Sequence, residues 1–194
     1  MLGGFTIEGA FRGRTQLALA QSAITVAEAA AEEAYGLGQA PLGPEHFLLG
    51  MFHLSPDDIA RAALITLGIT DLLQVRREII RLTQTSSQPV GVADLVFGNG
   101  AYAVIKEADR ERHRNIPPVT NSLYPTEMIE SGHLLLGLAR VRFTPNFAMD
   151  VLGTMGVDAP LRVGAAIAHH SPLYAAAQAA RLRDMLNIPR DQRS

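Results

Sequence analysis

Apolar residues recur every three or four positions over most of the chain, which predicts helices rather than strands. The first case is the stretch from Gln16 to Tyr35, which is free of proline and glycine and carries small apolar side chains on one face. Further helices are expected wherever the same periodicity lies between glycine, proline and capping signals. They cover residues 44–52, 59–67 and 71–82 in the first half, and 101–112, 132–139, 146–155, 159–168 and 173–186 in the second.

Part of this pattern occurs twice. Pro44–Gly50 reads Pro-Glu-His-Phe-Leu-Leu-Gly, and Ser131–Gly137 reads Ser-Gly-His-Leu-Leu-Leu-Gly, with the two histidines 87 positions apart. Each copy is followed by a Leu-Gly or Met-Gly turn, at Gly68 and Gly156, and then by a Val-Arg or Arg-Val pair. Internal repetition is typical of a supersecondary unit whose apolar face needs a partner. We therefore expect an all-α protein made of two tandem four-helix repeats with one core.

The repeats define the expected organisation. Residues 1–14 hold four glycines and little periodicity, so they are expected to be an irregular extension. Repeat 1 covers 15–82, a polar linker 83–92, and repeat 2 93–170. The C-terminal helix and tail, 171–194, have no counterpart in repeat 1. We expect this helix to cap the bundle, with docking of a partner as the alternative.

The first loop of repeat 2 is longer than its counterpart. Glu33-Ala34 matches Glu107-Ala108 at a spacing of 74, against 87 for the histidines, so 13 extra residues are expected within 115–128. Long loops in compact domains often carry function, and prolines lower the entropy lost on docking. Packing down over repeat 2 is the equal alternative. The candidate anchors for a partner in this loop are Ile116, Val119 and Tyr124.

Composition removes several function classes. The 194 residues carry 17 Lys and Arg against 19 Asp and Glu, so the chain as a whole lacks the positive field of a nucleic-acid-binding protein. There is no cysteine, which excludes a disulfide framework or a thiolate metal site and suits a reducing compartment. The sequence has no apolar run of about 20 residues and no secretory leader pattern. We expect a cytoplasmic protein with no membrane or nucleic-acid partner.

Histidines are the main candidates for chemistry. Glu45-His46 together with His133 would form an acid–base set, but a histidine that recurs in both repeats favours hydrogen bonds to loop backbone at two helix starts. Adjacent His169-His170 point about 100° apart on a helix and are not expected to bind a metal. The run 106–114 mixes charges and predicts a salt-bridged, exposed helix face. We expect no enzyme activity, cofactor or metal.

These motifs resemble the amino-terminal domain of Clp-type AAA+ unfoldases, in particular the ClpC type. Each half of that domain reads approximately Glu-Ala-x-x-Leu-Gly-His, then Gly-Thr-Glu-His-x-Leu-Leu-Gly-Leu, then Ala-x-x-x-Leu-x-x-Leu-Gly-Val and a Val-Arg helix. The resemblance spans about residues 16–168. The matching segments are Glu33–Gln39, Gly43–Gly50, Ala62–Ile69 and Val75-Arg76 in the first half, and Glu107-Ala108, His113, Ser131–Leu138, Val151–Val157 and Arg162-Val163 in the second.

The resemblance implies an all-helical repeat with pseudo-twofold symmetry that binds adaptors and substrate proteins. The sequence holds no Gly-x-x-x-x-Gly-Lys-Ser/Thr phosphate loop, so we expect a stand-alone relative without the ATPase module. We expect a non-catalytic protein-interaction module for substrate polypeptides, adaptors or Clp protease components. The alternative is a regulatory or sensor domain that holds a small molecule or peptide in the cleft between the repeats. The expected partner-binding residues outside the long loop are Pro44, Glu45, His46, Ser131 and His133.

Some domains of this family bind phosphoarginine through a glutamate and a threonine in each half. Glu45 stands at the first glutamate position, while the other three positions fall at or near Ala20, Asp94 and Gly132. A carboxylate can hold a guanidinium group, but without its phosphate-side donor the pocket is incomplete. The sequence therefore does not predict phosphoarginine recognition.

Overall fold

The protein is built from helices. The computed structural model describes residues 2–83, 90–114, 128–142, 145–157 and 160–185. These ranges contain ten α-helices, two 3-10 helices and no strand beyond two isolated bridges, so the predicted all-α class is confirmed. None of the helices described is long and apolar enough to cross a membrane. In chain order the elements are α1 (Ile7–Phe11), α2 (Gln21–Leu37), α3 (Pro44–Gly50), η1 (Met51–His53), α4 (Ile59–Thr66), α5 (Leu72–Thr83), η2 (Val92–Asp94), α6 (Asn99–Arg114), α7 (Ser131–Arg140), α8 (Phe147–Thr154), α9 (Pro160–His170) and α10 (Pro172–Met185).

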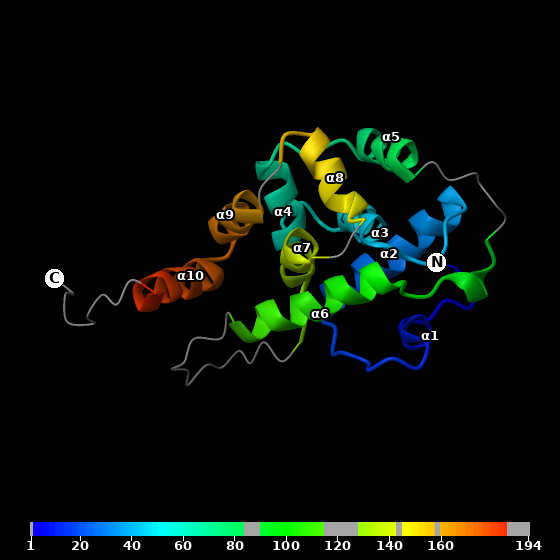
Figure 1. Cartoon of the computed structure of the whole chain (residues 1–194), viewed down its shortest axis with the longest axis horizontal. Helices are drawn as coiled ribbons and strands as arrows, with labels where there is room; N and C mark the ends of the chain where they lie inside the picture. Colours follow the sequence, from blue (N-terminus) through cyan, green and yellow to red (C-terminus); the bar gives the residue numbers. More distant parts are fainter. Residues whose placement is uncertain (1, 84–89, 115–127, 143–144, 158–159, 186–194) are drawn as a thin grey trace.

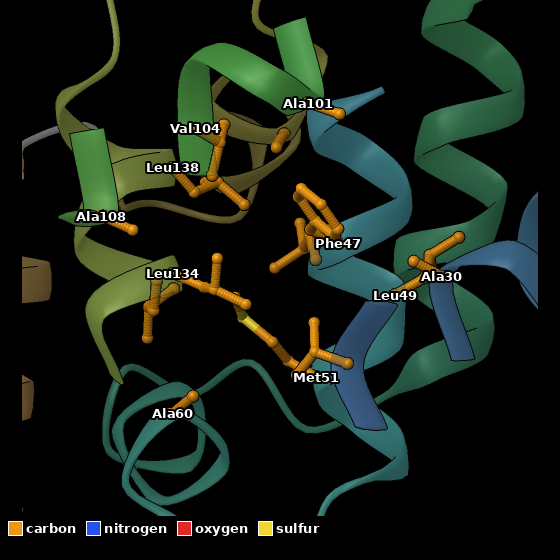
Figure 2. Close-up of a cluster of buried hydrophobic side chains, with 14 of the residues drawn as sticks. Ala30, Phe47, Leu49, Met51, Ala60, Ala101, Val104, Ala108, Leu134 and Leu138 are labelled. Atoms are coloured by element: carbon orange, nitrogen blue, oxygen red, sulfur yellow. The ribbon is translucent and has the colours of Figure 1, made fainter. Parts of the chain in front are cut away.

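Two short helices, α3 and α7, lie at the centre of the bundle (Figure 1). All seven residues of α3 are buried, as are eight of the ten residues of α7. A helix that is buried on every side has to be enclosed by other elements. Figure 2 shows Phe47 of α3 and Leu134 and Leu138 of α7 in one apolar cluster, together with Val104 of α6 and Met51.

The contacts between helices come in matching pairs. Helix α2 packs on α3, and α6 packs on α7. Helix α4 packs against α9, and α5 packs against α8, so helices that follow one central helix lie against helices that follow the other. Helix α3 also touches α8, as α7 touches α4. Helices from the two halves of the chain therefore pack against each other and share one continuous core.

Extended segments just before the helices also cross between the halves. Leu42, two residues before α3, forms a parallel bridge with Phe97, two residues before α6. Leu19, two residues before α2, forms the same bridge with Ile129, two residues before α7. This pairing explains why α2 begins five residues later than predicted, because the N–H of Ala20 donates to the carbonyl of Ile129 (2.8 Å).

Each central helix approaches the backbone of a neighbouring helix at one glycine. A Cβ atom on Gly50 would lie 3.0 Å from the backbone nitrogen of Ala30 in α2. A Cβ atom on Gly137 would lie 2.8 Å from the backbone nitrogen of Ala108 in α6. Glycine at these positions lets two helix backbones lie closer than any side chain would allow.

The two glycine contacts fall at corresponding places in α2 and α6. Ala30 and Ala108 are 78 positions apart, which is also the spacing between the first residues of α2 and α6. Counted at this spacing, Glu33 stands at the same place in α2 as Glu111 does in α6.

The N-terminal segment also differs from its prediction. Residues 1–14 are predicted to be irregular, whereas they include the short helix α1, whose first turn is capped by Thr6 Oγ1 accepting from the N–H of Gly9 (3.0 Å). Phe11 at the end of α1 is 2% exposed, and its ring meets that of Phe97 edge to face at 5.1 Å. The many glycines gave no periodic signal, but one aromatic anchor is enough to dock the segment on the core.

The C-terminal helix α10 packs on α9 beside the bundle (Figure 1). It buries Tyr174 and Ala177. The Tyr174 hydroxyl lies near Gly164 of α9 and accepts from the Arg140 guanidinium (3.4 Å).

We predict that Gly50→Ala and Gly137→Ala each lower the free energy of unfolding by about 1–3 kcal/mol, because the added methyl group meets backbone that cannot move aside. Gly153→Ala in α8 is the matched control, since nothing lies within 4 Å of its Cβ position. Alanine is the better helix former, so this control should leave stability unchanged or raise it by up to about 1 kcal/mol. Urea unfolding of the three variants measures this, and equal effects would contradict the close approach.

Candidate functional site

The candidate site is a pocket of about 880 Å³ between the two halves of the chain. One wall is the loop from Gly38 to Pro41 and the start of α3, and the other is the segment from Val90 to Asn99 that leads into α6. The Leu42–Phe97 bridge joins these walls at the base. Glu45 and His46, two of the predicted partner-binding residues, both line this pocket.

The start of α3 places Glu45 in the pocket. Pro44 occupies the first position of the helix, where its missing N–H is not needed and its fixed φ suits the helix. The Glu45 carboxylate folds back over Gly43, where a Cβ atom would lie 2.6 Å from its carboxyl carbon. Only glycine leaves room for this side-chain position. Pro44 itself is buried and does not line the pocket.

Glu45 is an acid held away from water. It is 7% exposed, and its Oε2 atom has no hydrogen-bond partner among the described residues. Burial raises the pKa of this carboxyl above its usual value, and a hydrogen bond from its own backbone N–H lowers it by a smaller amount. A buried carboxylate oxygen without a partner costs stability. The structure thus retains an acid with one carboxylate oxygen that no described residue bonds.

His46 is fully engaged in structural hydrogen bonds. Its Nδ1 accepts from the backbone N–H of Gly43 (2.9 Å), so the ring proton stands on Nε2, which donates to Oε1 of Gln39 (2.8 Å). Gln39 in turn donates to the hydroxyl of Thr83 (3.1 Å). Burial lowers the pKa of His46 to about 4. The ring therefore stays neutral and fixes the loop beside Glu45, which agrees with the predicted backbone contact.

His133, the second predicted histidine, makes the corresponding backbone hydrogen bond at the start of α7. The Nδ1 atom of His133 accepts from the backbone N–H of Glu130 (3.1 Å). Burial, followed by the nearby charge of Arg112, lowers its pKa to about 4. The Ser131 hydroxyl donates to Oδ1 of Asp58 (2.6 Å), which ties α7 to the start of α4. The structure therefore does not bring Ser131 or His133 into the pocket with Glu45.

No equivalent acid stands at the start of α7. The position that matches Glu45 is Gly132, where a Cβ atom would lie 3.0 Å from the side chain of Ile59. An apolar side chain thus fills the space that a glutamate would need. A carboxylate at the second position of the helix is therefore present in α3 and not in α7.

Two arginines that the sequence analysis did not single out line the opposite rim of the pocket. Arg12 donates to the carbonyl of Ala93 (3.3 Å), and Arg14 donates to the carbonyl of Gly98 (3.2 Å). The Arg14 guanidinium also lies over the ring of Tyr102, at 4.9 Å from its centroid. They follow α1 in a segment without hydrophobic periodicity, so nothing in the sequence pattern pointed to them.

The remaining predicted residues lie elsewhere. Ile116, Val119 and Tyr124 of the long loop lie outside the described residues. Exposed His170 bonds to the Thr66 hydroxyl through Nε2 (2.7 Å). Among the residues that the structure describes, no group of His, Asp and Glu is arranged to hold a metal ion.

We predict that Glu45→Gln raises the free energy of unfolding by about 1 kcal/mol at neutral pH, because it removes the charge from a buried, unsatisfied carboxylate. This gain in stability should shrink as the pH falls through the raised pKa of Glu45, because the carboxyl of the native protein is then protonated and uncharged. Urea unfolding at several pH values measures the difference. A constant loss of stability in the variant would show that the carboxylate is satisfied.

We also predict a loss of stability between about pH 7 and about pH 5 from the two buried histidines. Unfolded histidine gains a proton near 6.5, whereas His46 and His133 do so only near 4, so each loses about 2 kcal/mol of stabilisation over this range. Glu45 and Glu130, whose pKa values are raised, act in the opposite sense. His133→Gln isolates the effect and should reduce the pH slope, while an unchanged slope would contradict the burial of this ring.

Comparisons with known proteins add no relative to this picture. No protein-family model matches the chain, and no curated protein matches it.

Proposed function

We propose that the two halves are copies of one four-helix unit, residues 15–82 and 93–170, related by an approximate twofold axis. Three observations support this: the matching helix contacts, the twin bridges before the helices, and the twin glycine contacts of α3 and α7. Each of these three sets of contacts is found again when α2, α3, α4 and α5 are replaced by α6, α7, α8 and α9, and the reverse. Two unrelated halves would have no reason to repeat them at corresponding positions.

We further propose that the protein is a non-catalytic interaction module, related to the receptor domain of Clp unfoldases, that binds substrate polypeptides, adaptors or Clp protease components. The observation that carries this proposal is the Glu45 carboxylate, buried in the wall of a pocket with one oxygen unpartnered. A lysine or arginine side chain from a partner would supply the missing donors. The stability that Glu45 costs the free protein is then recovered in the complex.

The character of the pocket supports a polypeptide ligand. Glu45 and Asp94 give it acidic groups, and Arg12 and Arg14 give it basic ones. Apolar residues, among them Phe97, also line the pocket. A peptide segment offers the matching mixture of charged side chains, apolar side chains and backbone groups.

The histidines support binding rather than catalysis. Both ring nitrogens of His46 are engaged, so this residue has no free nitrogen with which to move a proton for a substrate. His133 does not line the pocket that holds Glu45. The acid–base set considered from the sequence is therefore not brought together.

A crosslinking pull-down from the native cell tests the proposal, with the tagged full chain, Glu45→Gln and Glu78→Gln as baits. Glu78→Gln is the matched control, because it removes one carboxylate from α5, where Glu78 pairs only with Arg81 among the described residues. We expect Clp subunits, adaptors or Clp substrates with the native chain and with Glu78→Gln, and much less with Glu45→Gln. Recovery of none of these proteins would overturn the proposed role.

A regulatory or sensor domain is the second candidate, because a pocket of about 880 Å³ is within the size range of small-molecule sites. A ligand that binds only the folded protein raises the melting temperature by mass action. A thermal-shift screen of metabolites separates the two functions. A hit that is lost in Glu45→Gln, with no Clp component in the pull-down, would favour the sensor role.

A further inference from the structure

A second pocket, also of about 880 Å³, lies along the C-terminal half of α6, between that helix, the end of α7 and the start of α9. It is separate from the Glu45 pocket, which meets α6 only at its first residue. Its walls carry five cationic side chains and one carboxylate, namely Lys106, Arg110, Arg114, Arg140, Arg142 and Glu107. We call it the basic pocket.

Two acids hold part of this positive charge in place. Glu111 is fully buried under the pocket, where its two oxygens accept from Arg114 and Arg140. Glu107 pairs with Arg110 (2.8 Å) and with Arg114 (3.2 Å). The predicted salt-bridged face is thus present along α6, but Glu111 is buried rather than exposed. These ion pairs fix three guanidinium groups in a concave arrangement.

The remaining two cations are not neutralised. Among the described residues, no carboxylate forms an ion pair with Lys106 or Arg142, and both side chains are exposed. The Lys106 ammonium lies 5.9 Å from the centroid of the Tyr102 ring, which leaves its charge in place. With five cations facing one carboxylate in the wall and one beneath it, the pocket has a clear excess of positive charge.

The fold itself does not require this charge. Under the proposed equivalence of the halves, Lys106 and Arg110 correspond to Glu28 and Glu32, because α2 and α6 are 78 positions apart. Glu28 and Glu32 are exposed on α2 as their counterparts are on α6. The same helix face is therefore acidic in one half and basic in the other. Helix packing explains neither choice.

We propose that the basic pocket binds an acidic segment of a partner polypeptide, a run of aspartate or glutamate side chains. Guanidinium groups accept carboxylates as paired hydrogen bonds, and three of them are already held in position by Glu107 and Glu111. The pocket is local, whereas a nucleic acid presents a long row of phosphates. Outside the pocket the chain has more acids than bases, so it lacks the general excess of positive charge that such a polyanion favours.

Fluorescence anisotropy with the full chain tests this proposal. The probe is a labelled peptide of consecutive glutamates, and the same peptide made of glutamines is its control. We expect the glutamate peptide to bind and the glutamine peptide not to bind. Added salt should weaken the binding, because exposed charges are screened over about 10 Å at 0.1 M ionic strength.

The double variant Lys106→Gln/Arg142→Gln should weaken binding about tenfold, because it removes the two cations that no described acid neutralises. Arg77→Gln/Arg81→Gln is the matched control, with the same charge removed from exposed positions of α5. Glu45→Gln should leave binding unchanged, which separates this proposal from the function proposed for the first pocket. An equal loss in the control pair, or binding of an oligonucleotide or of inorganic tripolyphosphate without binding of the peptide, would overturn the proposal.

Discussion

The rest of the structure depends on the close approach of α3 to α2 and of α7 to α6, which one glycine in each central helix makes possible. Because Gly50 and Gly137 bring the backbones together, the two central helices can be enclosed on every side. The helices that follow each of them then pack against helices of the other half. Neither half could bury its apolar surface alone, which is the general reason why repeated units share a core.

The position of the Glu45 pocket follows from this packing of one half against the other. The Leu42–Phe97 bridge holds the loop before α3 against the loop before α6, and the pocket lies where these loops meet. His46 fixes the first loop with both ring nitrogens, which leaves Glu45 as the polar side chain with an unused oxygen. An acid kept at a cost to stability is a common property of binding sites, where flexibility or unmet hydrogen bonds serve the ligand.

Much of the helical pattern could be read from the sequence, because buried faces of alanine, leucine and valine are bounded by glycine and proline. The extended segment before α2 could not be predicted, since Leu19 forms a bridge with Ile129, which is more than a hundred positions away in the sequence. The close approach of Gly50 to Ala30 and of Gly137 to Ala108 could not be predicted either, because it depends on how the helices pack. Arg12 and Arg14 of the pocket rim were missed because Phe11 docks a segment that has no periodicity.

We propose that a polypeptide docks between the halves at Glu45. Amide chemical-shift mapping by NMR on the labelled full chain, titrated with an unfolded polypeptide that contains lysine and arginine, tests it most directly. We expect the shifts to concentrate in the two pocket walls, in the loop before α3 and at Val90–Asn99, and we expect Glu45→Gln to remove them. Shifts confined to other surfaces, or shifts that persist in the variant, would contradict it.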